Sequence, residues 1–272
     1  MPARLHHERI GGGPRALAIT HGILGAGANW RAIAKQVVAR RPEWSCVLVD
    51  LRQHGHSERG EPPHDLAACA ADVRVLFDEL PALEVLAGHS FGGKVMLATR
   101  ALAPARLRQT WIFDASPSAR LDRAFDPSET VARLIALMER LPRTFARRDD
   151  FVAAVVADGH TRPLAQWLAM NLAADASGTY TLRLDLAAIR TMLADYFARD
   201  LWPVLLDPDL PGEVEIVVAE RSAVVTADDR RRLASAPQHV HVDTIAAGHW
   251  LHIDAPAAVV ELLALRLPRG DS

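Results

Sequence analysis

Gly88-His-Ser-Phe-Gly-Gly93 follows an apolar run, residues 84–87, and precedes a helical pattern over residues 94–100. The stretch is a G-x-S-x-G pattern at a predicted turn from a strand to a helix. Such a turn exposes the serine hydroxyl at the edge of a sheet, and small neighbours let the two backbones pass closely. The pentapeptide alone is common, but the strand before it and the helix after it make the match specific. We therefore expect Ser90 to be a nucleophile at the carboxyl end of a strand.

Short apolar runs and longer helical patterns alternate on both sides of Ser90. The predicted strands span residues 15–20, 46–50, 84–88, 110–114, 214–219 and 239–244. The predicted helices span residues 29–41, 65–80, 90–103, 226–235 and 256–267. This alternation indicates an α/β fold, with a mostly parallel sheet flanked by helices on both faces. Residues 5–10 are expected to add an antiparallel edge strand.

The alternation is interrupted once, between residues 116 and 206. Helical patterns there span residues 128–140, 150–158, 163–174 and 186–197, and residues 179–184 predict a short strand or an extended loop. This block is too apolar for a linker. We therefore expect one domain, in which residues 1–115 and 207–272 form the α/β core and residues 116–206 form a helical cap. Ligands of α/β sheets bind at the carboxyl ends of the strands, so the cap is expected to cover the site.

The composition excludes several classes of function. Half of the 272 residues are apolar, and 31 basic residues stand against 33 acidic ones, for a net charge of −2. Disorder is therefore not expected, and neither nucleic acid nor an anionic membrane is an expected partner. No apolar run reaches the ~18 residues that span a bilayer, and no signal peptide is recognisable. Cys46 and Cys69 form no C-x-x-C pair, so we expect reduced thiols in a cytoplasmic protein, with no metal site.

A serine hydroxyl needs a base to become a useful nucleophile. Of the 12 histidines, His249 follows the last predicted strand directly and precedes the last predicted helix. A loop at that place lies at the carboxyl edge of the sheet, beside Ser90. We therefore expect His249 to be the base, with His252, closer to the start of the helix, as the alternative.

The tetrahedral intermediate of acyl transfer needs amide donors for its oxyanion. One is expected to be the backbone N–H of Phe91, directly after the nucleophile. The other should come from the loop after the strand at residues 15–20, which contains Ile23 and Leu24. The sequence does not choose between these two amides.

Four motifs of this chain resemble the α/β-hydrolase superfamily, over nearly its full length. They are His21-Gly-Ile-Leu-Gly25, Asp50-x-Arg-x-His-Gly-x-Ser57, Gly88-His-Ser-x-Gly-Gly-Lys94 and Gly248-His-Trp-x-His252. The last two are most similar to those of small bacterial acyl esterases and their mitochondrial relatives. The resemblance implies a Ser-His-Asp triad, no cofactor, and a small-molecule substrate that is a short to medium acyl ester or a thioester.

The triad acid is the point at which this chain departs from the commonest family pattern. Many members carry an aspartate shortly after the penultimate strand of the main sheet, where this chain has Ser222. A serine cannot stabilise an imidazolium by charge. In the esterase branch that shares this feature, the resemblance places the acid at the end of the strand after the nucleophile helix, which is Asp114 here. Glu220 is the alternative, whereas Asp228 fits the first turn of a helix.

Several other side chains have structural interpretations. His54 lies in a motif loop that is expected to pack under the site, and Lys94 is expected to pack on the nucleophile helix. Apolar side chains of the cap either line an acyl pocket or form the core of the cap, and the sequence leaves both open. These side chains are Met138, Trp167, Met170 and Met192.

Alternative functions also remain open at this point. The same triad serves C–C bond hydrolases, thioesterases and lyases of the menaquinone-pathway type. A lyase of that type acts on a dicarboxylic substrate and needs several arginines in its pocket, for which Arg52 and Arg120 are the candidates. A non-catalytic ligand-binding protein on this fold is a further alternative. The sequence identifies neither the physiological substrate nor the oligomeric state.

Overall fold

Seven strands form the main sheet in a computed structural model that describes residues 1–123 and 130–269, and their order is β1-β3-β2-β4-β5-β9-β10. They are β1 (His7–Ile10), β2 (Arg15–Thr20), β3 (Trp44–Val49), β4 (Leu83–His89), β5 (Gln109–Phe113), β9 (Glu213–Ala219) and β10 (Val240–Ile245). Strand β1 pairs antiparallel with β3, and the other neighbours pair in parallel. The predicted fold, including its antiparallel edge strand, is confirmed.

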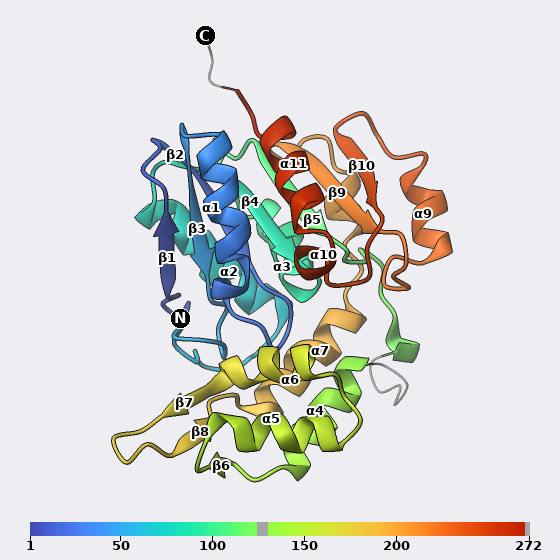
Figure 1. The fold of residues 1–272 in the computed structure, drawn as a ribbon. Helices are drawn as coiled ribbons and strands as arrows, with labels where there is room; N and C mark the ends of the chain where they lie inside the picture. Colours follow the sequence, from blue (N-terminus) through green and yellow to red (C-terminus); the bar gives the residue numbers. More distant parts are fainter. Residues whose placement is uncertain (124–129, 270–272) are drawn as a thin grey trace.

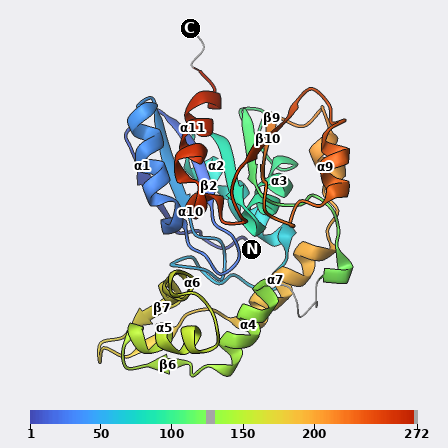
Figure 2. The same cartoon turned by 45° about the vertical axis from the view of Figure 1, so that its right-hand side comes forward.

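Helices cover both faces of this sheet (Figures 1 and 2). One face carries α1 (Arg31–Arg40) and α11 (Pro256–Arg266), and the other carries α2 (Leu66–Glu79) and α3 (Phe91–Arg100). The short helices of the core are η1 (Gly27–Trp30), α9 (Ala227–Leu233) and α10 (Leu251–Asp254). Within the described part of the chain, no helix is both long and apolar enough to cross a bilayer.

The inner strands β2, β3, β4, β5 and β9 are buried almost throughout, because helices cover both faces of the sheet. Along β2, Leu17 and Ile19 contribute to the core under α1 and α11, whereas Ala16 and Ala18 contribute to the core under α2 and α3. This alternation is the two-residue period of a strand. The sequence also explains where α2 begins, because the side chain of Asp65 caps this helix by accepting from the amide of Ala68 at 2.7 Å.

Residues 116–206, between β5 and β9 and hereafter the insertion, lie on the side of the main sheet to which the parallel strands point (Figures 1 and 2). The insertion comprises η2 (Leu121–Arg123), α4 (Thr130–Arg140), β6 (Thr144–Phe145), α5 (Arg148–Ala157), α6 (Arg162–Leu168), η3 (Ala169–Asn171), β7 (Leu172–Ala174), β8 (Tyr180–Leu182), α7 (Leu186–Ala198) and α8 (Trp202–Leu206). Its apolar side chains join the core of α2 and α3, so it packs on the sheet domain. The start of the predicted helix at residues 128–140 lies outside the described residues.

The insertion contains a small antiparallel sheet, β6-β8-β7, that the sequence predicts only in part. The expected helix at residues 163–174 appears as α6 followed by the 3-10 helix η3, and it is wrong from Leu172 onward, because Leu172 pairs with Leu182 in β8 instead. A tight turn closes this hairpin: Asp175 accepts from the amides of Ser177 and Thr179, and Gly178 has a φ of 84°. Strand pairing with a distant segment overrides a local helical pattern here.

Candidate active site

The turn between β4 and α3 holds Ser90 in a backbone conformation that few side chains adopt. Its φ of 53° and ψ of −119° lie outside the regions of ordinary L-residues. The neighbouring glycines make the turn possible. A Cβ atom on Gly88 would lie 2.3 Å from the carbonyl oxygen of Gly92, and one on Gly92 would lie 2.4 Å from that of His21. The sequence G-x-S-x-G therefore meets a steric demand of this turn.

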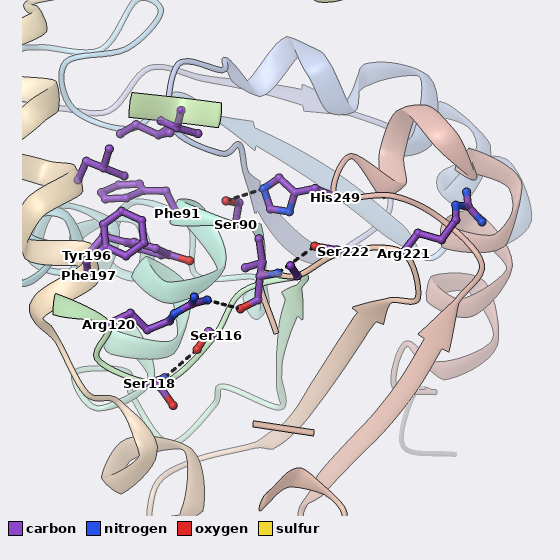
Figure 3. A pocket seen from close by; sticks show the side chains of 15 residues that line it. Ser90, Phe91, Ser116, Ser118, Arg120, Tyr196, Phe197, Arg221, Ser222 and His249 are labelled. Atoms are coloured by element: carbon purple, nitrogen blue, oxygen red, sulfur yellow. Dashed lines mark hydrogen bonds between the residues drawn. The ribbon is translucent and has the colours of Figure 1, made fainter. Parts of the chain in front are cut away.

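Ser90 is joined to two other side chains by a chain of hydrogen bonds. The Nε2 atom of His249 lies 3.0 Å from the Oγ atom of Ser90, and its Nδ1 atom lies 2.7 Å from the Oδ2 atom of Asp114. Figure 3 shows the imidazole directed at the Ser90 hydroxyl. With Nδ1–H donating to the carboxylate, Nε2 is left to accept the serine proton.

Asp114 lies immediately after β5 and is completely buried. Its φ of 46° turns the side chain toward the loop that follows β10, where His249 lies. The second carboxylate oxygen, Oδ1, accepts from the amide of Ala219 at 3.1 Å. Both oxygens are thus held by donors, which fixes the carboxylate beside the imidazole.

The alternative acids and the alternative base lie elsewhere. Glu220 is exposed, and Asp228 is an exposed partner of Arg231. The ring of His252 stacks on Trp30, with 5.2 Å between the ring centroids. Burial and the neighbouring His249 lower the pKa of His252 to about 4. The structure therefore brings Ser90, His249 and Asp114 together, and it leaves these three alternatives apart from them.

The two candidate oxyanion amides on the loop after β2 are in different situations. The amide of Leu24 donates to the Nε2 atom of His54 at 3.1 Å, so it is already used. Ile23 lines the same cavity as Ser90 and Phe91. Phe91 is the first residue of α3, where backbone N–H groups have no partner inside the helix. The geometry therefore favours the amide of Ile23 over that of Leu24 as the second donor, a choice that the sequence leaves open.

His54 is a positioning residue that the sequence points to only through its motif. Burial lowers its pKa to about 3, so the ring is neutral and its Nε2 atom accepts. Its Nδ1–H donates to the carbonyl of Arg52 at 2.9 Å. Asp50, from the same motif, accepts from the amides of Gly27 and His56 at 2.7 and 2.9 Å. The motif loop thereby supports the backbone of the loop that contains Ile23.

Arg52 does not face the site, which corrects its candidacy as a substrate-binding arginine. Its guanidinium forms a buried bidentate pair with Asp72, with N–O distances of 2.6 and 2.8 Å. Lys94 is also buried, and its Nζ atom donates to the carbonyls of Ser118 and Tyr196 at 2.9 and 2.8 Å. Burial lowers the pKa of Lys94 to about 8. Lys94 therefore ties α3 to the start and the end of the insertion, a role that its place on the helix alone does not indicate.

A cavity of about 320 Å³ opens beside the Ser90 hydroxyl. The insertion and the core both contribute to its walls, as Figure 3 shows. Its lining residues are Ile23, Ser90, Phe91, Ser116, Ser118, Arg120, Val131, Leu193, Tyr196, Phe197, Arg221, Ser222, Ala223, Val224 and His249. Met138 and Met192 belong to the apolar core instead, Met170 is exposed, and Trp167 borders a much smaller hollow beside Trp250. Among the described residues, no cluster of His, Cys, Asp or Glu is suited to hold a metal ion.

Comparisons with known proteins agree with this architecture. Residues 17–262 match the model described as the Alpha/beta hydrolase family. The sn-1-specific diacylglycerol lipase ABHD11 of Xenopus laevis is 28% identical over 247 residues, which cover 88% of this chain and 75% of the relative. Esterase YbfF of Escherichia coli is 28% identical over 254 residues, 91% of each chain. A solved structure described as a marine microorganism esterase superposes with a TM-score of 0.82 at 21% identity, covering 96% of this chain and 98% of that one.

Proposed function

Because this chain belongs to the alpha/beta hydrolase family, we propose that it is a serine hydrolase that cleaves carboxylic esters with short to medium acyl groups. Family membership confirms the resemblance that the four sequence motifs indicate. Its distant homologues include esterases and lipases. The reaction and the residues that carry it out are the content of the proposal.

One observation carries the proposal: the hydrogen-bonded series from Asp114 through His249 to Ser90, at the wall of a cavity. A buried carboxylate beside Nδ1 favours the tautomer in which Nε2 accepts, and it stabilises the imidazolium that forms. The strained turn presents the Ser90 hydroxyl to the cavity. A core histidine with a merely structural role would need neither arrangement.

In the proposed reaction, the Oγ atom of Ser90 attacks the acyl carbon while its proton passes to Nε2 of His249. The carbonyl oxygen becomes an oxyanion, which the amides of Phe91 and Ile23 stabilise. The C–O bond to the alcohol then breaks, and His249 returns the proton to the leaving alcohol. Water attacks the resulting acyl-enzyme, His249 takes its proton, and the Ser90 oxygen leaves with that proton as the acid is released.

We further propose that the insertion, residues 116–206, is a cap that selects the substrate. Val131, Leu193, Tyr196 and Phe197 of the insertion supply an apolar wall opposite Ser90. Such a wall suits an acyl or alcohol chain, because burying apolar surface contributes roughly 25 cal/mol for each Å². The lyase alternative loses support, since Arg52 is paired with Asp72 away from the cavity.

The proposal is tested by hydrolysis of a series of p-nitrophenyl esters, from acetyl to lauroyl, by the wild type and by Ser90→Ala. Ester hydrolysis predicts turnover by the wild type and a loss of several powers of ten in Ser90→Ala. Equal turnover by both proteins would refute Ser90 as the nucleophile. No turnover, with fluorophosphonate still labelling Ser90, would refute the ester as the substrate and favour the C–C hydrolase, lyase or ligand-binding alternatives.

A further inference from the structure

Arg120 presents a positive charge to the cavity that contains Ser90 and His249. Its backbone amide donates to the carbonyl of Phe197 at 2.6 Å, which fixes the chain at this point. In its guanidinium, one nitrogen donates to the carbonyl of Val224 at 3.3 Å. Within the described part of the chain, no carboxylate lies within 4.0 Å of this guanidinium. The described residues therefore use only a small part of the donor capacity of the Arg120 guanidinium.

The part of the cavity wall that the structure describes offers no negative charge to balance Arg120. None of the described residues that line the cavity is Asp or Glu. Asp229 lies behind the wall, where it accepts from the hydroxyls of Ser116 and Ser118. Although burial alone would raise the pKa of Asp229, these hydrogen bonds and those from Thr226 hold it below its ordinary value. The carboxylate of Asp229 is therefore already satisfied by donors other than Arg120.

The side chain of Arg120 is also placed differently from the neighbouring arginine. Figure 3 shows Arg120 reaching along the cavity wall, whereas the side chain of Arg221 points away from the cavity. Arg221 is exposed, and Arg120 is only partly exposed. A guanidinium that is partly desolvated beside apolar side chains is stabilised when a ligand supplies an anion. Carboxylates meet that need, because their two oxygens match the fork of the guanidinium.

We propose that the ester hydrolysed at Ser90 carries a carboxylate that binds the guanidinium of Arg120. This inference rests on the proposed function and names the substrate class of the same site. A monoanion is specified because, of the two arginines among the described lining residues, Arg120 lies along the cavity wall, whereas the side chain of Arg221 points away from it (Figure 3). A phosphate dianion would leave excess negative charge beside Arg120, because the other described lining residues, apart from Arg221, are serines, apolar or aromatic residues and a histidine.

The experiment compares pairs of esters that differ in the carboxylate alone or nearly so. On the acyl side, mono-p-nitrophenyl adipate is compared with p-nitrophenyl hexanoate. On the alcohol side, 4-acetoxybenzoate is compared with p-tolyl acetate. The quantity measured is kcat/KM for the ester with the carboxylate divided by kcat/KM for its neutral partner. This ratio cancels any general loss of activity in a variant.

We expect Arg120→Gln to lower the ratio for one of the two pairs by about 10- to 100-fold, the range set by a charge-assisted hydrogen bond. Arg120→Lys should recover part of the ratio, because it restores the charge but not the fork. Arg162→Gln is the control and should leave both ratios as they are in the wild type, because Arg162 is exposed and is not among the residues that line the cavity. Ratios that Arg120→Gln leaves unchanged for both pairs would overturn the inference while ester hydrolysis stands.

A binding measurement separates this inference from the proposed function. Monomethyl adipate is titrated calorimetrically into Ser90→Ala and into the double variant Ser90→Ala/Arg120→Gln. At least about tenfold weaker binding by the double variant supports the carboxylate site even if no ester is turned over. Equal affinity for the two proteins overturns the role of Arg120. Tighter binding of the corresponding phosphate monoester than of the carboxylate would overturn the choice of a monoanion.

Discussion

Replacing Asp114 by Asn changes one atom of the side chain, and the fold should tolerate it, since Asn accepts a positive φ nearly as well as Asp. The hydrogen-bond pattern is what changes. In the wild type, Oδ1 accepts from the amide of Ala219 and Oδ2 accepts from Nδ1–H of His249. The side-chain amide of the variant has one oxygen and one NH₂ group, so it can satisfy only one of these two donors.

Either orientation of the new side-chain amide is costly, but for different reasons. If its oxygen faces Ala219, the NH₂ group faces Nδ1 of His249. The imidazole must then place its proton on Nε2, which faces Ser90 and can no longer accept the serine proton. If the oxygen faces His249, two donors meet at Ala219, and the imidazolium loses its buried counter-charge. We expect kcat to fall by about 10³- to 10⁴-fold, which corresponds to about 4 to 5.5 kcal/mol of transition-state stabilisation.

The assay is steady-state hydrolysis of the best p-nitrophenyl ester, with thermal unfolding recorded in parallel. Glu220→Gln is the matched control, because Glu220 follows β9 at the same edge of the sheet but is exposed. That variant should keep kcat within about twofold of the wild type, as surface substitutions away from a site usually do. A normal kcat in Asp114→Asn, or a large loss in Glu220→Gln, would refute the assignment of the acid.

Three further outcomes follow from other parts of the structure. Lys94→Met should lower the free energy of unfolding, measured in urea, by about 2–4 kcal/mol, because the carbonyls of Ser118 and Tyr196 lose a charged donor. The exposed control Lys35→Met should change it by no more than about 0.5 kcal/mol. Equal effects would contradict the role of Lys94 in holding the insertion to α3. The free energy of unfolding should fall as pH drops from 7.5 to 5. In the unfolded chain His54 and His252 bind a proton below about pH 6.5, whereas in the folded protein their pKa values are about 3 and about 4. His54 alone accounts for about 2 kcal/mol at pH 5, and a urea midpoint that does not change with pH would contradict this effect. Gly92→Ala should abolish ester turnover and lower Tm, since its Cβ would lie 2.4 Å from a backbone carbonyl oxygen, and a fully active variant would show that the turn is not constrained in this way.

Much of the fold can be predicted from the sequence, because the local preference of most segments for strand or helix agrees with their packing in the folded protein. Apolar runs bounded by turns predict the strands of a sheet buried on both faces, and Asp65 and Thr226 mark helix starts that the structure contains. The hairpin of β7 and β8 is less legible, because its pairing depends on a partner about ten residues away rather than on its own pattern.

The residues of the candidate site differ in how far the sequence alone predicts them. Ser90 and His249 follow from motif and position, because each lies just after a strand of one parallel sheet. Asp114 is reached through a resemblance, since only the three-dimensional turn after β5 brings it to the imidazole. The choice between Ile23 and Leu24 depends on a hydrogen bond to His54, which lies 30 residues away. The orientation of Arg52 could not be predicted either, because it depends on an ion pair with the buried Asp72, which lies in α2, 20 residues further along the chain.

The central claim, that Ser90 is the nucleophile activated by His249, is tested most directly by peptide mass spectrometry after fluorophosphonate labelling. The wild type should carry one adduct, on Ser90, and its esterase activity should fall in proportion to the labelled fraction. His249→Ala should label far more slowly, because no base then takes the serine proton. An adduct on another residue, or full ester turnover by protein labelled at Ser90, would contradict the account.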